Sequence, residues 1–95
     1  MSHLFDISGK VAVVTGGSRG IGLMIARGFV EAGAKTYISS RKADVCNAVA
    51  EERSRSGQCI SIPADLGSEA GCRYLADEVA KREEQVHILV NNAGA

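Results

Sequence analysis

The stretch VVTGGSRGIGLMIA, residues 13–26, joins a run of β-branched residues to an apolar segment with helical spacing. It holds four glycines within seven positions: Gly16, Gly17, Gly20 and Gly22. A glycine inside a helix or strand costs about 0.5–1 kcal/mol relative to alanine, so this cluster indicates a special turn from a strand into a helix. Backbone N–H groups and the positive end of the helix dipole meet at such a turn. The stretch therefore predicts an anion-binding site.

The spacing of the glycines excludes two common phosphate-binding motifs. Gly17 and Gly22 have the separation that a P-loop requires, but Leu23 follows where the P-loop needs a lysine. The general dinucleotide fingerprint G-x-G-x-x-G is not matched either. The pattern present is T-G-x-x-x-G-x-G, beginning at Thr15. From this stretch alone, a tight turn without a ligand remains the alternative.

Beyond this turn, the chain alternates between short β-branched runs and stretches with helical spacing. The runs are VAVVT (11–15), KTYIS (35–39), QCISIP (58–63) and VHILV (86–90). The first and last are nearly continuous in apolar residues, which is typical of strands covered on both faces. We expect the first helix to end at Gly33 and the third to be capped by Ser68. The order β-α-β-α-β-α-β predicts an α/β fold: a Rossmann-type doubly wound parallel sheet with strand order 3-2-1-4.

The helical stretches also predict which faces pack against the sheet. In the second stretch, Val45, Ala48 and Val49 share a face. In the third, the apolar stripe consists of Cys72, Leu75, Ala76, Val79 and Ala80. We expect both stripes to be buried.

Composition narrows the class of protein. The 95 residues are enough for one small domain, and the 11 acidic and 11 basic residues cancel. This balance argues against a nucleic-acid or membrane-surface binder driven by bulk charge. No apolar run approaches the roughly 18 residues of a membrane span, and MSHLFDISGK does not resemble a signal peptide. A cytoplasmic location is the expectation.

The end of the sequence bears on domain organisation. The residues NNAGA directly follow the last predicted strand, which the order 3-2-1-4 places at a sheet edge. An open edge of this kind would be a template for aggregation. We therefore expect residues 1–95 to be the N-terminal part of a single Rossmann domain that continues further.

The cysteines and histidines do not suggest a metal site. Cys46, Cys59 and Cys72 are odd in number and far apart, and neither His3 nor His87 is near a cysteine in sequence. We expect the thiols to be buried or half-buried in a reducing compartment. His87 is expected to lie inside a buried strand with a structural role.

Three motifs together resemble the short-chain dehydrogenase/reductase family. They are TGGSRGIG (15–22), ADL (64–66) and NNAG (91–94), and the resemblance covers almost the whole chain. VTGGSRGIG and ILVNNAG look most like the branch that includes 3-oxoacyl-[acyl-carrier-protein] reductases. Within that branch, EAGAK and IPADLGSEAG are similar to a rhamnolipid-type reductase.

The resemblance implies a role for each motif. The loop that wraps the cofactor's adenosine ribose and pyrophosphate would consist of Gly16, Ser18, Arg19, Gly20, Ile21 and Gly22, with the Ile21 N–H near a phosphate. Asp65 would accept a hydrogen bond from the adenine amino group, beside the Leu66 backbone. Asn92, Ala93 and Gly94 would contact the adenosine ribose side. Asn91 would tie neighbouring strands together. For Asp65 alone, a helix-capping or loop carboxylate is the alternative.

The residues at the tip of the second predicted strand indicate whether NAD or NADP is the expected cofactor. NAD-binding folds place a carboxylate there for the ribose 2′-OH, but this chain has Ser39, Ser40, Arg41 and Lys42, and no carboxylate before Asp44. A guanidinium can bind a 2′-phosphate in a forked, charge-assisted geometry. A basic residue in the glycine loop (Arg19 here) or at this strand tip goes with NADP in the family. We therefore expect NADP; the alternative for Arg41 and Lys42 is a solvated pair that opens a surface helix.

The catalytic residues that the resemblance implies are absent from this chain. The family transfers hydride between a nicotinamide and a carbonyl or alcohol, using a Tyr-x-x-x-Lys pair. Here Tyr37 is followed four residues later by Arg41, and Tyr74 by Glu78. We therefore interpret the chain as the cofactor-binding part of an NADP(H)-dependent enzyme that reduces a carbonyl. A 3-oxoacyl thioester is the candidate substrate. The resemblance also implies a homo-oligomer, a tetramer or dimer. The alternative is a truncated nucleotide-binding module without activity.

Overall fold

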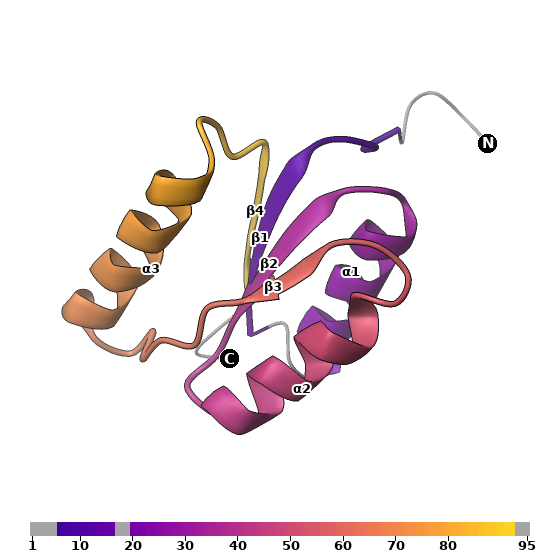
Figure 1. The fold of residues 1–95 in the computed structure, drawn as a ribbon. Coiled ribbons are helices and arrows are strands. Elements are labelled where there is room, and N and C mark those ends of the chain that lie inside the picture. Colours follow the sequence, from indigo (N-terminus) through magenta and orange to yellow (C-terminus); the bar gives the residue numbers. More distant parts are fainter. Residues whose placement is uncertain (1–5, 17–19, 93–95) are drawn as a thin grey trace.

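A computed structural model describes residues 6–16 and 20–92. The strands are β1 (Val11–Thr15), β2 (Lys35–Ser39), β3 (Cys59–Ser61) and β4 (Ile88–Asn91), and the helices are α1 (Gly20–Glu31), α2 (Ala43–Arg53) and α3 (Glu69–Arg82). The strands pair in parallel in the order β3-β2-β1-β4. Helices α1 and α2 lie on one face of the sheet and α3 on the other (Figure 1). The predicted doubly wound sheet and its strand order are confirmed.

Local sequence signals account for the helix ends. Gly33 has a positive φ of 93°, its N–H bonds to Val30 O, and Ala34 N–H bonds to Phe29 O. This pair of bonds is a Schellman motif, which satisfies the last carbonyls of α1 and requires the left-handed conformation that glycine adopts easily. At the start of α3, the Ser68 side chain accepts a bond from Gly71 N–H. Both predicted helix ends are confirmed.

The core has one layer on each face of the sheet. Alternate residues of β1 point to opposite faces, so Val14 packs with Ile38 under α1 and α2, while Val13 packs with Tyr37 under α3. The helices complete the two layers with Ala26, Val30, Cys46 and Ala50 on the first face and Leu75 and Val79 on the second. All five residues of β1 are buried, as expected for a central strand of a parallel sheet.

The predicted buried faces of α2 and α3 were partly wrong. In α2 the buried residues are Cys46 and Ala50, while Val45 is 37% exposed, because neighbouring helix positions lie about 100° apart around the axis. In α3 only Leu75 and Val79 are buried. The rest of the predicted α3 stripe, Cys72, Ala76 and Ala80, is exposed. The exposure of Cys72 contradicts the expectation that all three cysteines would be buried or half-buried. Cys46 and Cys59 are buried and agree with it.

Within the described residues, the last strand is only partly covered. Leu89 is 69% exposed, because β4 lies at the edge of the described sheet and the buried side chains of α3 pack against β1 and β2 instead. His87 precedes β4 and is exposed rather than buried. Its structural role is nevertheless visible: its Nδ1 accepts a 3.0 Å hydrogen bond from Val11 N–H, and its own N–H bonds to Val11 O.

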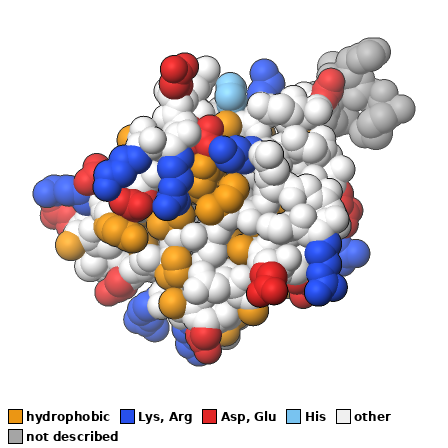
Figure 2. Space-filling model, in the orientation of Figure 1, with side chains coloured by type: hydrophobic (Ala, Val, Ile, Leu, Met, Phe, Trp, Pro, Cys, Tyr) orange, Lys and Arg blue, Asp and Glu red, His pale blue; other side chains and the backbone are white. Residues whose placement is uncertain are grey.

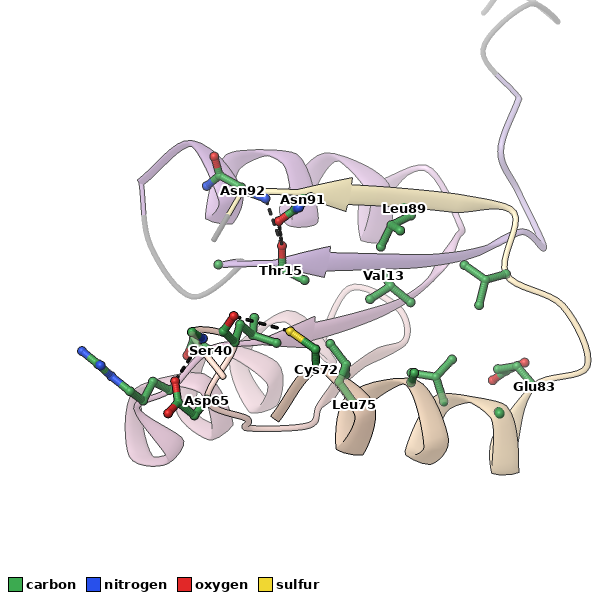
Figure 3. A pocket seen from close by; sticks show the side chains of 18 of the residues that line it. Val13, Thr15, Ser40, Asp65, Cys72, Leu75, Glu83, Leu89, Asn91 and Asn92 are labelled. Atoms are coloured by element: carbon green, nitrogen blue, oxygen red, sulfur yellow. Dashed lines mark hydrogen bonds between the residues drawn. The ribbon is translucent and has the colours of Figure 1, made fainter. Parts of the chain in front are cut away.

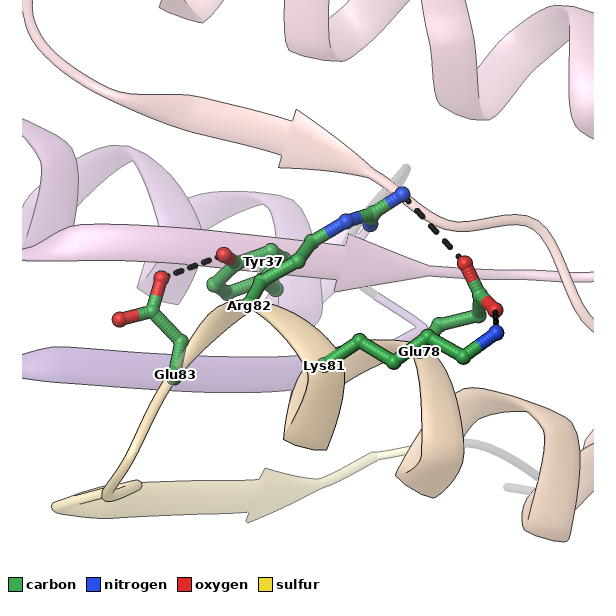
Figure 4. A network of polar contacts seen from close by, with 5 residues as sticks. All are labelled: Tyr37, Glu78, Lys81, Arg82 and Glu83. Carbon is green, nitrogen blue, oxygen red and sulfur yellow. Dashed lines mark hydrogen bonds and ion pairs between the residues drawn. The ribbon is translucent and has the colours of Figure 1, made fainter.

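A polar cluster fixes the end of α3 to the start of β2. The carboxylate of Glu83 accepts a 2.5 Å hydrogen bond from the Tyr37 hydroxyl and forms a 2.6 Å ion pair with Lys35 (the Tyr37 bond is drawn in Figure 4). The hydrogen bond from Lys35, and then that from Tyr37, lowers the pKa of Glu83. The same carboxylate raises the pKa of Lys35, while burial is the main cause that raises the pKa of Tyr37. Nearby, Glu78 pairs with Lys81 and Arg82 on the exposed surface of α3.

This cluster leads to a prediction about stability and pH. Glu83→Gln keeps the shape but removes the charge, and should lower the free energy of unfolding at pH 7 by about 1 kcal/mol. A carboxylate whose pKa is lowered by folding contributes stability above its unfolded value near 4.5 and loses that contribution as the pH falls through the folded value. The two proteins should therefore converge in urea-denaturation experiments below about pH 4.5. A constant difference from pH 7 to pH 2 would contradict this role.

Candidate functional site

The carboxyl ends of the strands border a long groove between the sheet and α3 (Figure 3). Its volume is about 1170 Å³. The predicted site residues that line it are Gly16, Gly20, Ile21, Arg41, Asp65, Leu66 and Asn92. Hydrophobic side chains reach the surface along the gap between α3 and the sheet (Figure 2). The fold therefore gathers segments up to 76 residues apart in sequence at one edge of the sheet.

The remaining predicted site residues are placed differently. Gly22 is buried in the first turn of α1, and Lys42 is exposed at the N-cap of α2; neither lines the groove. Ser18, Arg19, Ala93 and Gly94 lie outside the described residues.

The glycine turn brings the N-terminus of α1 close to the end of β1. Gly16 and Gly20 have φ values of 71° and 63°, which favour glycine. The Gly16 N–H donates a 2.7 Å bond to Ser39 O, which joins the turn to the end of β2. A Cβ on Gly22 would overlap the Gly16 carbonyl group and lie 2.9 Å from Asn92 Nδ2. There is no room for a side chain at this position, so glycine lets α1 begin directly at the groove. The N–H groups of a first helical turn can bind an anion there.

The Thr15 hydroxyl links β1 to β4 beside the turn. It lies 3.1 Å from Asn91 Oδ1 and 3.3 Å from Val90 O, and it accepts a 2.9 Å bond from Asn92 N–H (Figure 3 draws the bonds to Asn91 and Asn92). The expectation that Asn91 ties neighbouring strands together is confirmed. The same hydroxyl holds the backbone of Asn92 at the groove.

Removing this hydroxyl should have a measurable cost. Thr15→Val preserves the shape but leaves the Asn92 N–H without its acceptor, so the free energy of unfolding should fall by about 1–3 kcal/mol. Thr15→Ser retains the hydroxyl and is the matched control. Urea denaturation of the three proteins measures the difference. Thr15→Ser lacks only the methyl group and should lose less stability than Thr15→Val. A loss in Thr15→Val no larger than that in Thr15→Ser would contradict the role of the hydroxyl.

The tip of β2 presents both a cation and an unpaired hydroxyl. Arg41 is exposed and lines the groove, and the Oγ of its neighbour Ser40 is buried without a hydrogen-bond partner among the described residues. A buried hydroxyl without a partner costs free energy, which suggests a ligand that would bond to it. The first turn of α2 adds Asp44, but its N-cap residue Lys42 makes no side-chain capping bond. Sequence reasoning missed Ser40; its position directly before Arg41 was the available signal.

Asp65 lies in a tight turn before α3. Its Oδ1 accepts a 3.0 Å bond from Gly67 N–H, so the residue acts as a loop carboxylate, one of the two roles considered for it. The turn also lines the groove. Cys72 lies next to this turn and its thiol donates to Leu66 O at 3.4 Å. Sequence reasoning placed Cys72 in the core and so missed its position in the groove.

Two other features are absent from residues 6–16 and 20–92. No group of three or more His, Cys, Asp or Glu side chains in this part of the chain is arranged to hold a metal ion. None of its helices has the length and hydrophobicity needed to cross a bilayer.

Known proteins resemble this chain in sequence and in fold. The family model for short chain dehydrogenase matches residues 10–95. The rhamnolipids biosynthesis 3-oxoacyl-[acyl-carrier-protein] reductase of Pseudomonas aeruginosa is 51% identical over 94 residues, which are 99% of this chain and 37% of that protein. The NADP-dependent (R)-specific alcohol dehydrogenase of Lentilactobacillus kefiri is 43% identical, over 93% of this chain and 35% of its own.

Solved structures agree with the sequence comparison. A Pseudomonas aeruginosa RhlG/NADP active-site complex superposes with a TM-score of 0.94 at 50% identity, covering 100% of this chain and 38% of the other. L-Sorbose reductase from Gluconobacter frateurii, in complex with NADPH and L-sorbose, gives 0.89 at 35% identity, covering 96% and 36%. The chain thus spans little more than a third of these relatives. The sheet order, the glycine turn and the family match over residues 10–95 together show that the chain belongs to the short-chain dehydrogenase/reductase family.

Proposed function

We propose that this chain is the cofactor-binding part of an NADP(H)-dependent short-chain oxidoreductase. One observation carries the proposal: a single groove combines the N-terminus of α1, the basic tip of β2 and the Asp65 turn, and at that tip the Ser40 hydroxyl has no hydrogen-bond partner in the described part of the chain. These three features suit the pyrophosphate, the 2′-phosphate and the adenine of one dinucleotide. Relatives named for NADP or NADPH support the choice of cofactor.

The pyrophosphate would lie over the glycine turn. The loop around it would consist of Gly16, Ser18, Arg19, Gly20, Ile21 and Gly22, and α1 would supply N–H groups and the positive end of its dipole. Gly22 would contribute by its small size, because it allows α1 to approach the end of β1.

The 2′-phosphate would bind at the tip of β2. Arg41 would supply a forked pair of donors, Ser40 Oγ a further hydrogen bond, and Lys42 and Arg19 additional positive charge. A carboxylate at this tip would repel the phosphate, and residues 39–42 contain none. This electrostatic difference is the basis for expecting NADP rather than NAD.

The adenosine would lie between the β3 and β4 segments. Asp65 would accept a hydrogen bond from the adenine amino group, and the Leu66 backbone would lie beside the base. Asn92, with Ala93 and Gly94, would contact the ribose. The Oδ1 of Asp65 is already bonded to Gly67 N–H, so Oδ2 is the oxygen available for this contact.

The full-length protein would reduce a carbonyl to an alcohol, with a 3-oxoacyl thioester as the candidate substrate. The name of the 51% identical relative supports that substrate class. Bound NADPH would supply the hydride. The proton donor would come from outside these 95 residues, because Tyr37 is bonded to Glu83 and Tyr74 is exposed on α3. A homo-oligomer, dimer or tetramer, and a cytoplasmic location remain predictions.

An assay of two proteins tests this function. The full-length protein should oxidise NADPH in the presence of a 3-oxoacyl thioester and do so much more slowly with NADH. The 95-residue chain alone should show no turnover. A full-length protein that binds NADPH but reduces no carbonyl would favour the alternative, a nucleotide-binding module without activity. A protein that binds neither cofactor would contradict the proposal.

A further inference from the structure

The first turn of α3 is packed against the Asp65 turn. The Asp65 carbonyl accepts a 3.2 Å bond from Ser68 N–H and a 3.1 Å bond from Ser68 Oγ. The same Ser68 hydroxyl accepts a 3.0 Å bond from Gly71 N–H. The helix cap and the groove-lining carboxylate are therefore parts of one hydrogen-bonded unit.

Gly71 is the residue that permits this close approach. A Cβ at this position would overlap the Asp65 carbonyl oxygen and lie 2.6 Å from its carbon, much closer than any real Cβ contact. The backbone conformation does not require glycine, because Gly71 is not among the glycines with positive φ. A glycine inside a helix costs about 1 kcal/mol relative to alanine. The contact with Asp65 accounts for a residue that helix propensity disfavours.

A second helical glycine provides the comparison. Gly28 is exposed in α1, and a Cβ there would meet nothing within 4 Å. The same substitution, glycine to alanine in a helix, is therefore free of clashes at Gly28 and blocked by backbone atoms at Gly71.

From this packing we propose that Gly71, together with Ser68, is a positioning residue for the cofactor's adenine. This inference rests on the proposed function, in which Asp65 accepts a bond from the adenine amino group. A side chain on Gly71 would push the Asp65 carbonyl away from α3, and the carboxylate of the same residue would move with it. Loss of Ser68 Oγ would remove one of the two bonds that hold that carbonyl. Neither residue needs to touch the cofactor to have this effect.

The experiment compares NADPH with its deamino analogue, which carries hypoxanthine in place of adenine and lacks the amino group. Dissociation constants are measured by calorimetry for the full-length wild type and for the Gly71→Ala, Gly28→Ala and Ser68→Ala variants. The wild type and Gly28→Ala should bind NADPH about tenfold more tightly than the analogue, because the bond to a carboxylate is lost. Gly71→Ala should bind NADPH about tenfold more weakly and discriminate between the two by less than about twofold. Ser68→Ala should show the same change to a smaller degree.

The ratio of the dissociation constants for NADPH and its deamino analogue distinguishes a positioning role of Gly71 from a general loss of structure. A loosened structure would weaken both ligands equally and keep the tenfold ratio, and that result in Gly71→Ala would overturn the inference while the proposed function stands. If Gly71→Ala does not fold, as judged by circular dichroism, an unchanged ratio in Ser68→Ala would overturn it instead. A wild type that binds both ligands equally would also reject this inference. A wild type that binds neither would reject the proposed function itself.

Discussion

Replacing Arg41 with alanine in the full-length protein should weaken NADPH binding by about 30- to 100-fold and change NADH binding by less than about twofold. Arg41 is exposed at the tip of β2 and lines the groove. Its guanidinium is therefore accessible to a 2′-phosphate, with which a guanidinium can form two charge-assisted bonds. NADH has no such phosphate and should be nearly insensitive to the change. Fluorescence titration of the two reduced cofactors measures both constants.

The matched control for Arg41 is Arg55→Ala. Arg55 is also an exposed arginine, but it lies in the turn between α2 and β3, at the opposite edge of the sheet. This variant has the same change in net charge and should bind both cofactors as the wild type does. Equal losses for NADPH and NADH in Arg41→Ala would refute the 2′-phosphate role. If Arg41→Ala and Arg55→Ala lost the same NADPH affinity, the loss would come from the change in net charge and not from a contact made by Arg41.

Replacing Gly22 with alanine should lower the free energy of unfolding by about 3 kcal/mol and abolish tight NADPH binding. The added Cβ would lie 2.8 Å from the Gly16 carbonyl carbon and 2.9 Å from Asn92 Nδ2. Relief of this overlap would require α1 to move away from the end of β1, because the nearest atoms belong to backbone. The same movement would open the turn that we propose for the pyrophosphate. Urea denaturation and cofactor titration measure the two effects.

Gly28→Ala is the control for Gly22→Ala within the same helix. Its Cβ would meet nothing within 4 Å, so alanine should leave stability unchanged or raise it by up to about 1 kcal/mol. Similar stabilities for the two variants would show that α1 can shift at no cost. That outcome would contradict the close approach of α1 to β1.

The fold was largely predictable, because short stretches of sequence mark its helices and strands and general topology rules restrict how the strands are ordered. The β-branched runs, Gly33 and Ser68 mark where elements begin and end, and alternation of strands with helices restricts the sheet to few orders. The burial of individual residues was less predictable. Periodicity alone did not distinguish Val45 from Cys46 as the buried residue of α2, and an apolar run did not show that Leu89 would be exposed at an edge.

The candidate site was predictable to the extent that it follows from motifs. The glycine turn, Asp65 and Asn92 were assigned from three motifs, and the structure places them around one groove. Contacts between distant segments were not visible in the sequence. The bond between Tyr37 and Glu83 spans 46 residues. That Ser40 Oγ is buried without a partner among residues 6–16 and 20–92 is apparent only in three dimensions. The fit of Gly71 against Asp65 is likewise a property of packing.

Hydrogen–deuterium exchange of the full-length protein, with and without saturating NADP⁺, tests the central claim most directly. The claim is that the cofactor binds across the carboxyl edge of the sheet. The account predicts slower amide exchange over residues 16–22, 40–42 and 65–67, and unchanged exchange over residues 54–58 at the opposite edge. Protection confined to the opposite edge, or no protection at all at saturating NADP⁺, would contradict it.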